Sequence, residues 1–204
     1  MSNPAHPTSL PLYTSPETLD FEALAALPKH PLDRDWYGNR PVAESTFVLA
    51  LDPANLWFSA ECRQTPDFDR QFGAGDFVEG LWQHDVAELF LVEDRTERYQ
   101  EFNLSPSGAW WSGVFDSYRE AGEAFNHKLS AINSCANVEQ NSWSAAIRIP
   151  RASLAIAIEF GPRSKANVSM IIGGGARQCL SWSKIAADKP DFHRFREFVC
   201  LEKR

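Results

Sequence analysis

The sequence has no dense basic stretch. Its 204 residues carry a formal net charge of −7 and an isoelectric point near 5.2. Such a chain repels phosphate backbones, which excludes nucleic acid as an expected partner. The basic residues near the end are interrupted by Phe and Glu, which is typical of a solvated last strand and tail; they are His193, Arg194, Arg196, Lys203 and Arg204.

Long apolar runs are missing too. No stretch approaches the roughly 18 apolar residues of a membrane-spanning helix, and the first 15 residues, MSNPAHPTSLPLYTS, lack the basic and apolar regions of an export signal. The sequence therefore predicts no contact with a membrane and a cytoplasmic location.

Cysteine is scarce and scattered. Cys62, Cys135, Cys179 and Cys200 form no C-x-x-C pair, and no His stands at a spacing suited to zinc, so a metal knuckle is not expected. Four cysteines allow two disulfides, but each lies in an apolar or strand-like stretch where a buried free thiol is ordinary. We expect free thiols.

Catalytic signatures are absent as well. The sequence contains no nucleophile elbow, no phosphate loop and no cluster of metal ligands. Three pairs suggest acid–base chemistry: His193 with Asp191, His84 with Asp85, and Glu88 with Glu101. Without a supporting motif, the sequence favours binding over catalysis and a structural role for His193, and it predicts no catalytic residue.

What the sequence does contain is apolar, strand-forming and punctuated by turns. It is 44% hydrophobic with seven Trp and 14 Phe, enough for a sizeable core in a single domain. Strand-like runs at Thr46–Leu51 and Leu56–Cys62 flank the turn DPAN and predict a hairpin. A three-stranded meander follows at His84–Val92, Arg98–Ser105 and Ala109–Asp116.

Further short strands are expected at residues 128–139, 142–149, 167–173, 179–183 and 195–201, with a helical turn at 150–156. Few helices and many short strands indicate an all-β antiparallel sandwich over residues 41–204. Residues 1–40 form an N-terminal extension packed on the domain, with a short helix at Ser15–Leu27 that Ser15 caps and Pro16 begins.

Alternation along the meander places polar groups on one face. Tyr99, Glu101 and Asn103 share a side of their strand, and Glu88 is a carboxylate in an otherwise apolar strand. If the first two meander strands pair antiparallel, Glu88 and Asn103 become near cross-strand neighbours. The pattern thus predicts a polar patch on an otherwise apolar sheet. Trp143 and Met170 are expected in the core.

Residues 81–120, LWQHDVAELFLVEDRTERYQEFNLSPSGAWWSGVFDSYRE, resemble the central signature of family 9 carbohydrate-binding modules and their DOMON-like relatives. The hairpin FVLALDPANLWFSAEC and the terminal SWSKIAADKPDFHRFREFVC are similar to the same lineage. The matching signature residues are Trp82, Asp85, Glu88, Phe90, Tyr99, Glu101, Phe102, Ser105, Pro106 and Gly108.

The resemblance implies a jelly-roll-like β-sandwich that clamps a terminal sugar unit between two Trp faces, with Glu, Asn and Arg around its hydroxyls. Trp82, Glu88 and Asn103 match this pattern. Trp182 is the candidate for the second Trp, whereas the Arg has no clear match beyond the neighbouring Arg98. The predicted ligand-binding set is Trp82, Glu88, Tyr99, Glu101, Asn103, Trp111, Trp182 and His193.

The sequence thus predicts non-catalytic binding of a small carbohydrate without a cofactor. Three alternatives stay open: a glycoside-processing enzyme that uses Glu88 and Glu101, a haem-binding DOMON-type module with Met170 as the available Met ligand, and an interaction sandwich without a small ligand. The acidic loop with Asp67, Asp69, Asp76 and Glu79 suggests calcium, although its spacing departs from the EF-hand. The oligomeric state stays open.

Overall fold

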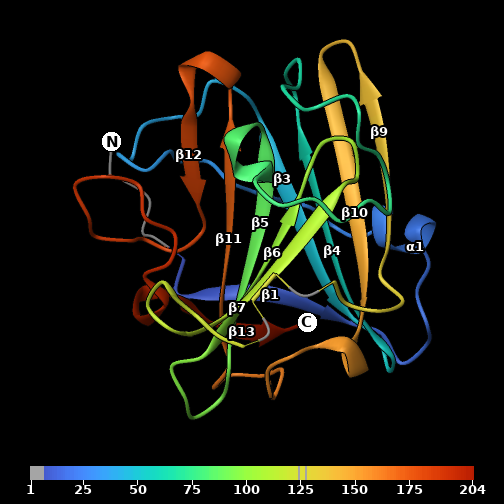
Figure 1. Cartoon of the computed structure of the whole chain (residues 1–204), viewed down its shortest axis with the longest axis vertical. Coiled ribbons are helices and arrows are strands. Elements are labelled where there is room, and N and C mark those ends of the chain that lie inside the picture. Colours follow the sequence, from blue (N-terminus) through green and yellow to red (C-terminus); the bar gives the residue numbers. More distant parts are fainter. Residues whose placement is uncertain (1–6, 124, 127) are drawn as a thin grey trace.

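A computed structural model describes residues 7–123, 125–126 and 128–204 (Figure 1). The strands are β1 Ser9–Thr14, β2 His30–Pro31, β3 Ser45–Leu51, β4 Asn55–Cys62, β5 Val86–Val92, β6 Tyr99–Leu104, β7 Trp110–Ser117, β8 Glu120–Ala121, β9 Asn133–Glu139, β10 Ser142–Pro150, β11 Lys165–Ile172, β12 Gln178–Ser181 and β13 Val199–Lys203. The helices are short: α1 Phe21–Ala25, and the 3-10 turns η1 Leu81–Gln83, η2 Arg151–Ser153, η3 Gly174–Ala176 and η4 Phe195–Glu197.

The described strands form one large curled mixed sheet. Its order is β8-β7-β6-β5-β11-β13-β1-β3-β4-β10-β9, with β12 paired to β11 and β2 paired to β3. Neighbours pair antiparallel except β1, which runs parallel to both β13 and β3. Figure 1 shows β1 and β13 crossing the lower part of the molecule at a steep angle to the longer strands. The purely antiparallel pairing expected from the sequence is therefore wrong at β1.

The predicted hairpin is confirmed as β3 and β4. Between the two strands, the Asp52 carboxylate accepts hydrogen bonds from the backbone N–H groups of Ala54 and Asn55 at 2.7 and 2.6 Å, and from the Trp57 indole at 2.8 Å. A short acidic side chain that bonds the backbone two and three residues ahead stabilises a tight turn. These bonds lower the pKa of Asp52 in spite of its burial.

The predicted meander is confirmed as β5, β6 and β7. The turn between β6 and β7 uses Gly108 at a φ of 83°, where an added Cβ would stand 3.1 Å from Ala74. Glycine reaches this left-handed conformation without steric cost. The register that follows pairs Glu88 directly with Asn103, and Asn103 with Trp111.

The inward faces of the two halves of the sheet share one hydrophobic core. Leu89 of β5, Phe102 of β6 and Met170 of β11 pack in the same cluster as Phe58 of β4 and Trp143 of β10. The predicted core positions of Trp143 and Met170 are thus confirmed. Because alternate residues of a strand point to opposite faces, the polar residues of the meander are left on the outer face.

The N-terminal segment differs from its prediction in two ways. The helix is limited to α1, and Asp20 caps it by accepting a 2.8 Å hydrogen bond from the Ala23 N–H, so the predicted start at Ser15 and Pro16 is wrong. The Ser15 hydroxyl instead accepts from the Glu17 N–H. Residues before the helix form β1, an internal strand that sequence reasoning missed.

The C-terminal segment, like the N-terminal one, differs from its prediction. At the C-terminus, residues 195–197 form a 3-10 turn, and the predicted last strand begins only at Val199. All four cysteines are free thiols. Among the described residues, no helix has the length and apolar character needed to cross a membrane.

Candidate functional site

The outer face of β5, β6, β7 and β11 is the part of the sheet that carries polar and aromatic side chains together. Glu88, Glu101 and Asn103 lie on this face with the rings of Trp111 and Phe115. Residues that follow β7 and β11 in the chain, among them Arg119, Phe125, Arg177, Phe192 and His193, border this face and enclose a cavity of about 610 Å³. This volume falls within the roughly 300–1,000 Å³ typical of small-molecule sites.

The cavity joins parts of the chain that are far apart in sequence. Its lining comprises Glu79, Gly80, Trp82, Glu88, Glu101, Trp111, Phe115, Arg119, Phe125, Ile171, Arg177, Cys179, Pro190, Phe192 and His193. Of the residues predicted from the sequence, Trp82, Glu88, Glu101, Trp111 and His193 line it directly. Tyr99 and Asn103 lie beside it through their contacts with His193 and Glu88.

Trp82 presents an indole at this cavity that is 52% exposed. It lies in η1, which follows Gly80 at a φ of 84° and precedes β5. The Arg177 guanidinium donates to the Trp82 carbonyl, so the backbone of η1 is tied to the segment after β11. The result is a fixed backbone with an aromatic face free for contact.

Trp111 is held differently. Its ring lies over Gly113, where a Cβ would come within 2.2 Å of the indole, so only glycine fits there. Its Nε1 donates to the Asn126 side chain at 2.7 Å, and Asn126 in turn donates to Glu79 at 2.7 Å. Trp110 points to the opposite face, into the core, as the alternation predicts for adjacent residues of a strand.

Glu88 and Glu101 are buried carboxyl groups on the cavity floor, exposed by 3% and 4%. Since Glu88 pairs with Asn103, Glu101 is its diagonal neighbour on the next strand, within reach of a long side chain. Burial raises the pKa of Glu88 to about 7, opposed by a 3.1 Å hydrogen bond from the Ser169 hydroxyl. Burial and the charge of Glu88 raise the pKa of Glu101 well above its ordinary value.

Asn103 is a buried amide next to these carboxyl groups, exposed by 1%. A side-chain hydrogen bond from Asn103 lowers the pKa of Glu101, but within the described residues neither its Oδ1 nor its Nδ2 has a partner at regular hydrogen-bond geometry. A buried polar side chain is nearly always bonded to protein, water or ligand. Asn103 therefore marks a position beside the cavity floor where a polar group of a ligand or a water molecule would complete the hydrogen bonding of its amide.

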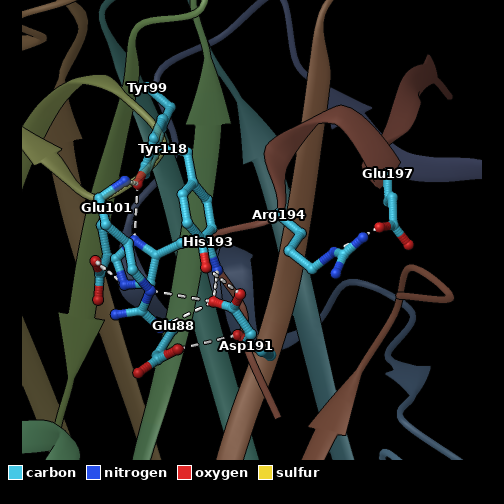
Figure 2. Close-up of polar contacts among 10 residues, drawn as sticks. Glu88, Tyr99, Glu101, Tyr118, Asp191, His193, Arg194 and Glu197 are labelled. Atoms are coloured by element: carbon cyan, nitrogen blue, oxygen red, sulfur yellow. Dashed lines mark hydrogen bonds and ion pairs between the residues drawn. The ribbon is translucent and has the colours of Figure 1, made fainter. Parts of the chain in front are cut away.

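His193 receives a chain of hydrogen bonds that sets its tautomer. The Arg119 backbone N–H donates to the Tyr99 oxygen at 3.2 Å, and the Tyr99 oxygen lies 2.8 Å from Nδ1 of His193. With Tyr99 as donor to Nδ1, the proton of the neutral imidazole is on Nε2, which lies 3.8 Å from Glu101 Oε2. Burial and the charge of Arg119 lower the pKa of His193 to about 4, and burial raises that of Tyr99. Figure 2 shows Glu88, Glu101 and His193 directed toward one region, apart from the Arg194–Glu197 pair.

Asp191 anchors the covering segments. Arg119 donates to its Oδ1 from Nη2 at 2.8 Å and from Nε at 3.3 Å, and the Tyr118 hydroxyl donates to Oδ2 at 2.6 Å (Figure 2). Together these bonds lower the pKa of Asp191. Sequence reasoning missed Arg119 and Arg177; the only signals were their positions just after the third meander strand and just before the penultimate strand.

Trp182 does not lie at this cavity. Its Nε1 donates to the Ser9 carbonyl at 2.8 Å, and its ring packs edge-on against Phe47, at a centroid distance of 5.2 Å, and against His30. The structure therefore does not bring Trp182 together with Trp82. The aromatic groups that do face the cavity with Trp82 are Trp111, Phe115, Phe125 and Phe192.

The acidic residues considered for calcium have separate protein partners. Asp67 lies 3.2 Å from His84, Asp69 accepts from Gln71, Asp76 accepts from the Gly73 N–H, and Glu79 accepts from Asn126. Within the described ranges, no group of three or more potential ligands converges on a metal position.

Met170, considered for haem, lies in the core on the opposite face of β11 from Ser169 and Ile171. Ser169 bonds to Glu88, and Ile171 lines the cavity. Met170 therefore cannot ligate a group bound in the cavity, because the sheet lies between them.

Comparison with solved structures identifies the class of fold. A candidate carbohydrate-binding protein from Bacteroides uniformis has a TM-score of 0.73 and 18% identity, with 97% of this chain and 99% of that chain covered. A family 9 carbohydrate-binding module from Caldicellulosiruptor kristjanssonii in complex with glucose has a TM-score of 0.61 and 13% identity, covering 96% and 97%. A family 9 module from the same organism in complex with cellotriose has a TM-score of 0.57 and 12% identity, covering 96% and 95%.

The predicted resemblance to family 9 carbohydrate-binding modules is thus confirmed for the fold, over nearly the whole chain. The DOMON-like part of the resemblance stays a prediction. No protein-family model and no curated protein matches the sequence.

Proposed function

We propose that this chain is a non-catalytic carbohydrate-binding module that holds a small sugar in the cavity beside Trp82. The observation that carries the proposal is the Trp82 indole, half exposed at a cavity whose floor holds buried carboxyl groups. The finer fold class, a jelly-roll-like β-sandwich of the family 9 lineage, belongs to the same proposal. The solved relatives with glucose and cellotriose support it.

The chemistry of a sugar complements this arrangement. A pyranose has a patch of C–H bonds on each ring face and hydroxyls around its rim, which suit an aromatic platform with polar groups beside it. Trp82 provides the platform. Glu88 and Glu101 accept from hydroxyls, the Nε2–H of His193 donates, and the amide of Asn103 gains the partners that it lacks.

The expected affinity is modest. Covering about 100 Å² of apolar surface at ~25 cal/mol/Å² contributes roughly 2 to 3 kcal/mol. After the cost of immobilising the ligand, a dissociation constant between about micromolar and millimolar follows.

Titration with a panel of mono- and disaccharides, followed by tryptophan fluorescence, tests the proposal. We expect saturable changes, because Trp82 and Trp111 both border the site. Signals that stay flat to high millimolar sugar, with no heat of binding by calorimetry, would contradict it.

A glycoside-processing activity is the second candidate, favoured by the adjacency of Glu88 and Glu101. A protonated and an ionised carboxyl group side by side are the groups that glycoside hydrolysis uses. This candidate requires that the protein release the aglycone from aryl glycosides and that Glu101→Gln abolish this release. Binding without any turnover would leave the module interpretation in place.

A further inference from the structure

The two carboxyl groups of the cavity floor have no cationic side chain in contact with them. Among the described residues, Glu88 accepts one hydrogen bond, from Ser169, and forms no ion pair. Among the described residues, the basic group paired with Glu101 is Nε2 of His193, at 3.8 Å from Oε2. That separation exceeds hydrogen-bond distance, and the low pKa of His193 keeps its ring neutral at neutral pH.

The arginines that line the cavity are engaged elsewhere. Arg119 directs its Nη2 and Nε to Asp191, and Arg177 donates to the Trp82 carbonyl. Neither guanidinium forms an ion pair with Glu88 or Glu101 in the part of the chain that the structure describes. Within the described residues, the charges of Arg119 and Arg177 therefore act on the floor only across space, and no guanidinium contacts either carboxyl group.

A pair of buried carboxylates without a cation is unstable. One remedy is a proton held by the pair, which agrees with the raised pKa values of both groups. The other is a cation brought by the ligand. An ammonium group has three donors and a full charge, and its hydrogen bonds to carboxylates are about twice as strong as those of a neutral donor.

We propose that the ligand of this cavity is an amino sugar, whose protonated amine binds between Glu88 and Glu101 while its ring stacks on Trp82. This inference rests on the proposed function, because the ring platform and the hydroxyl partners are those of the sugar site. A neutral sugar offers only hydroxyls to the floor and brings no charge that could replace the shared proton. An acidic sugar adds a third negative group beside Glu88 and Glu101.

Calorimetry of the full chain at pH 7 with glucosamine, glucose and N-acetylglucosamine tests the inference. The three share one ring and differ only in the substituent at C2, which is cationic in glucosamine and neutral in the other two. We expect glucosamine to bind at least about tenfold more tightly than the other two, the factor that corresponds to about 1.4 kcal/mol.

Two variants and a control locate the effect. Glu88→Gln and Glu101→Gln remove the carboxylates but keep the size of the side chain, so we expect each to bring the affinity for glucosamine within about threefold of that for glucose. Glu139→Gln, on the exposed strand β9 far from the cavity, removes the same charge and should keep the preference. Thermal unfolding of each variant checks that it is folded.

The pH dependence gives an independent measurement. Protons compete with the amine for the carboxyl pair, so the affinity for glucosamine should fall as the pH is lowered from 7 to 5, while that for glucose changes less. The other titratable or charged groups around the pair are Tyr99, Arg119, Arg177, Cys179, Asp191, His193 and Glu79.

The outcomes separate the two proposals. Equal affinities for glucose and glucosamine would overturn the amino-sugar assignment and leave sugar binding intact, whereas no binding of any sugar would overturn both. Tighter binding of glucuronate than of glucosamine would assign recognition to Arg177 and refute the role of the carboxyl pair. Ethanolamine that binds as well as glucosamine, with no effect of Trp82→Ala, would show an amine site without a sugar platform and refute the assignment.

Discussion

Replacing Trp82 with alanine removes the aromatic platform of the proposed sugar site while leaving the rest of the cavity in place. The indole is 52% exposed, so one of its faces is available for a ligand. If a sugar ring covers about 100 Å² of it at ~25 cal/mol/Å², the loss is about 2.5 kcal/mol, or a roughly 70-fold weaker dissociation constant.

Folding stability should change much less than affinity. Alanine keeps the backbone carbonyl to which Arg177 donates, and little buried surface is lost from a side chain that is half exposed. We expect the free energy of unfolding to fall by less than about 1 kcal/mol, within the range of surface substitutions.

Isothermal titration calorimetry with the tightest-binding sugar of the panel measures the affinity, and urea unfolding measures the stability. Val138→Ala, at an exposed apolar residue of β9 remote from the cavity, is the matched control and should leave the affinity unchanged. If Trp82→Ala binds within threefold of the unmodified protein, the indole is not a platform and the proposed site is refuted.

Three further outcomes follow from the structure. Trp182→Phe removes the hydrogen bond to the Ser9 carbonyl, so the free energy of unfolding in urea should fall by about 1 kcal/mol. Calorimetry should find an unchanged sugar affinity, and a large loss of affinity would contradict the placement of Trp182 away from the cavity. Gly113→Ala puts a Cβ within 2.2 Å of the Trp111 ring, so we expect a loss of about 1 to 3 kcal/mol in stability together with weaker binding, and an unchanged melting temperature would be incompatible with the packing. Since burial raises the pKa of Glu88 to about 7, the folded state holds a proton that the unfolded chain releases near pH 4.5. The stability that this proton contributes is present below pH 4.5 and is lost as the pH rises to 7, so Glu88→Gln should gain stability relative to the unmodified protein across that window, by no more than about 3 kcal/mol. A stability difference that does not depend on pH would argue against the raised pKa.

The local parts of this fold could be predicted from the sequence because short turns fix their register. The hairpin of β3 and β4 and the meander of β5, β6 and β7 follow from alternation between turn residues. The pairing of Glu88 with Asn103 follows from the same register, since a short turn leaves few alternatives. These elements position the residues of the cavity that lie on the meander strands, namely Glu88, Glu101 and Trp111.

The rest of the site depends on contacts that no local pattern encodes. The Arg119–Asp191 pair joins residues 72 positions apart, and β1 meets β13 across nearly the whole chain. Trp182 was the candidate for the second Trp that the family resemblance implies. Whether its ring faces the cavity or its Nε1 reaches the Ser9 carbonyl depends on how the N-terminal segment packs. Parallel pairing of a Pro-containing segment near the N-terminus carries no clear sequence signal either.

The position of β1 between β13 and β3 has a consequence for how the molecule is made. Strand β1 is synthesised before both of its partners, and one of them, β13 at residues 199–203, follows every other strand of the sheet in sequence. Until then β1 exposes an unpaired parallel edge, the kind of edge that recruits other chains. We therefore expect completion of the sheet to be a late and slow step of folding, as sequence-distant pairing generally is.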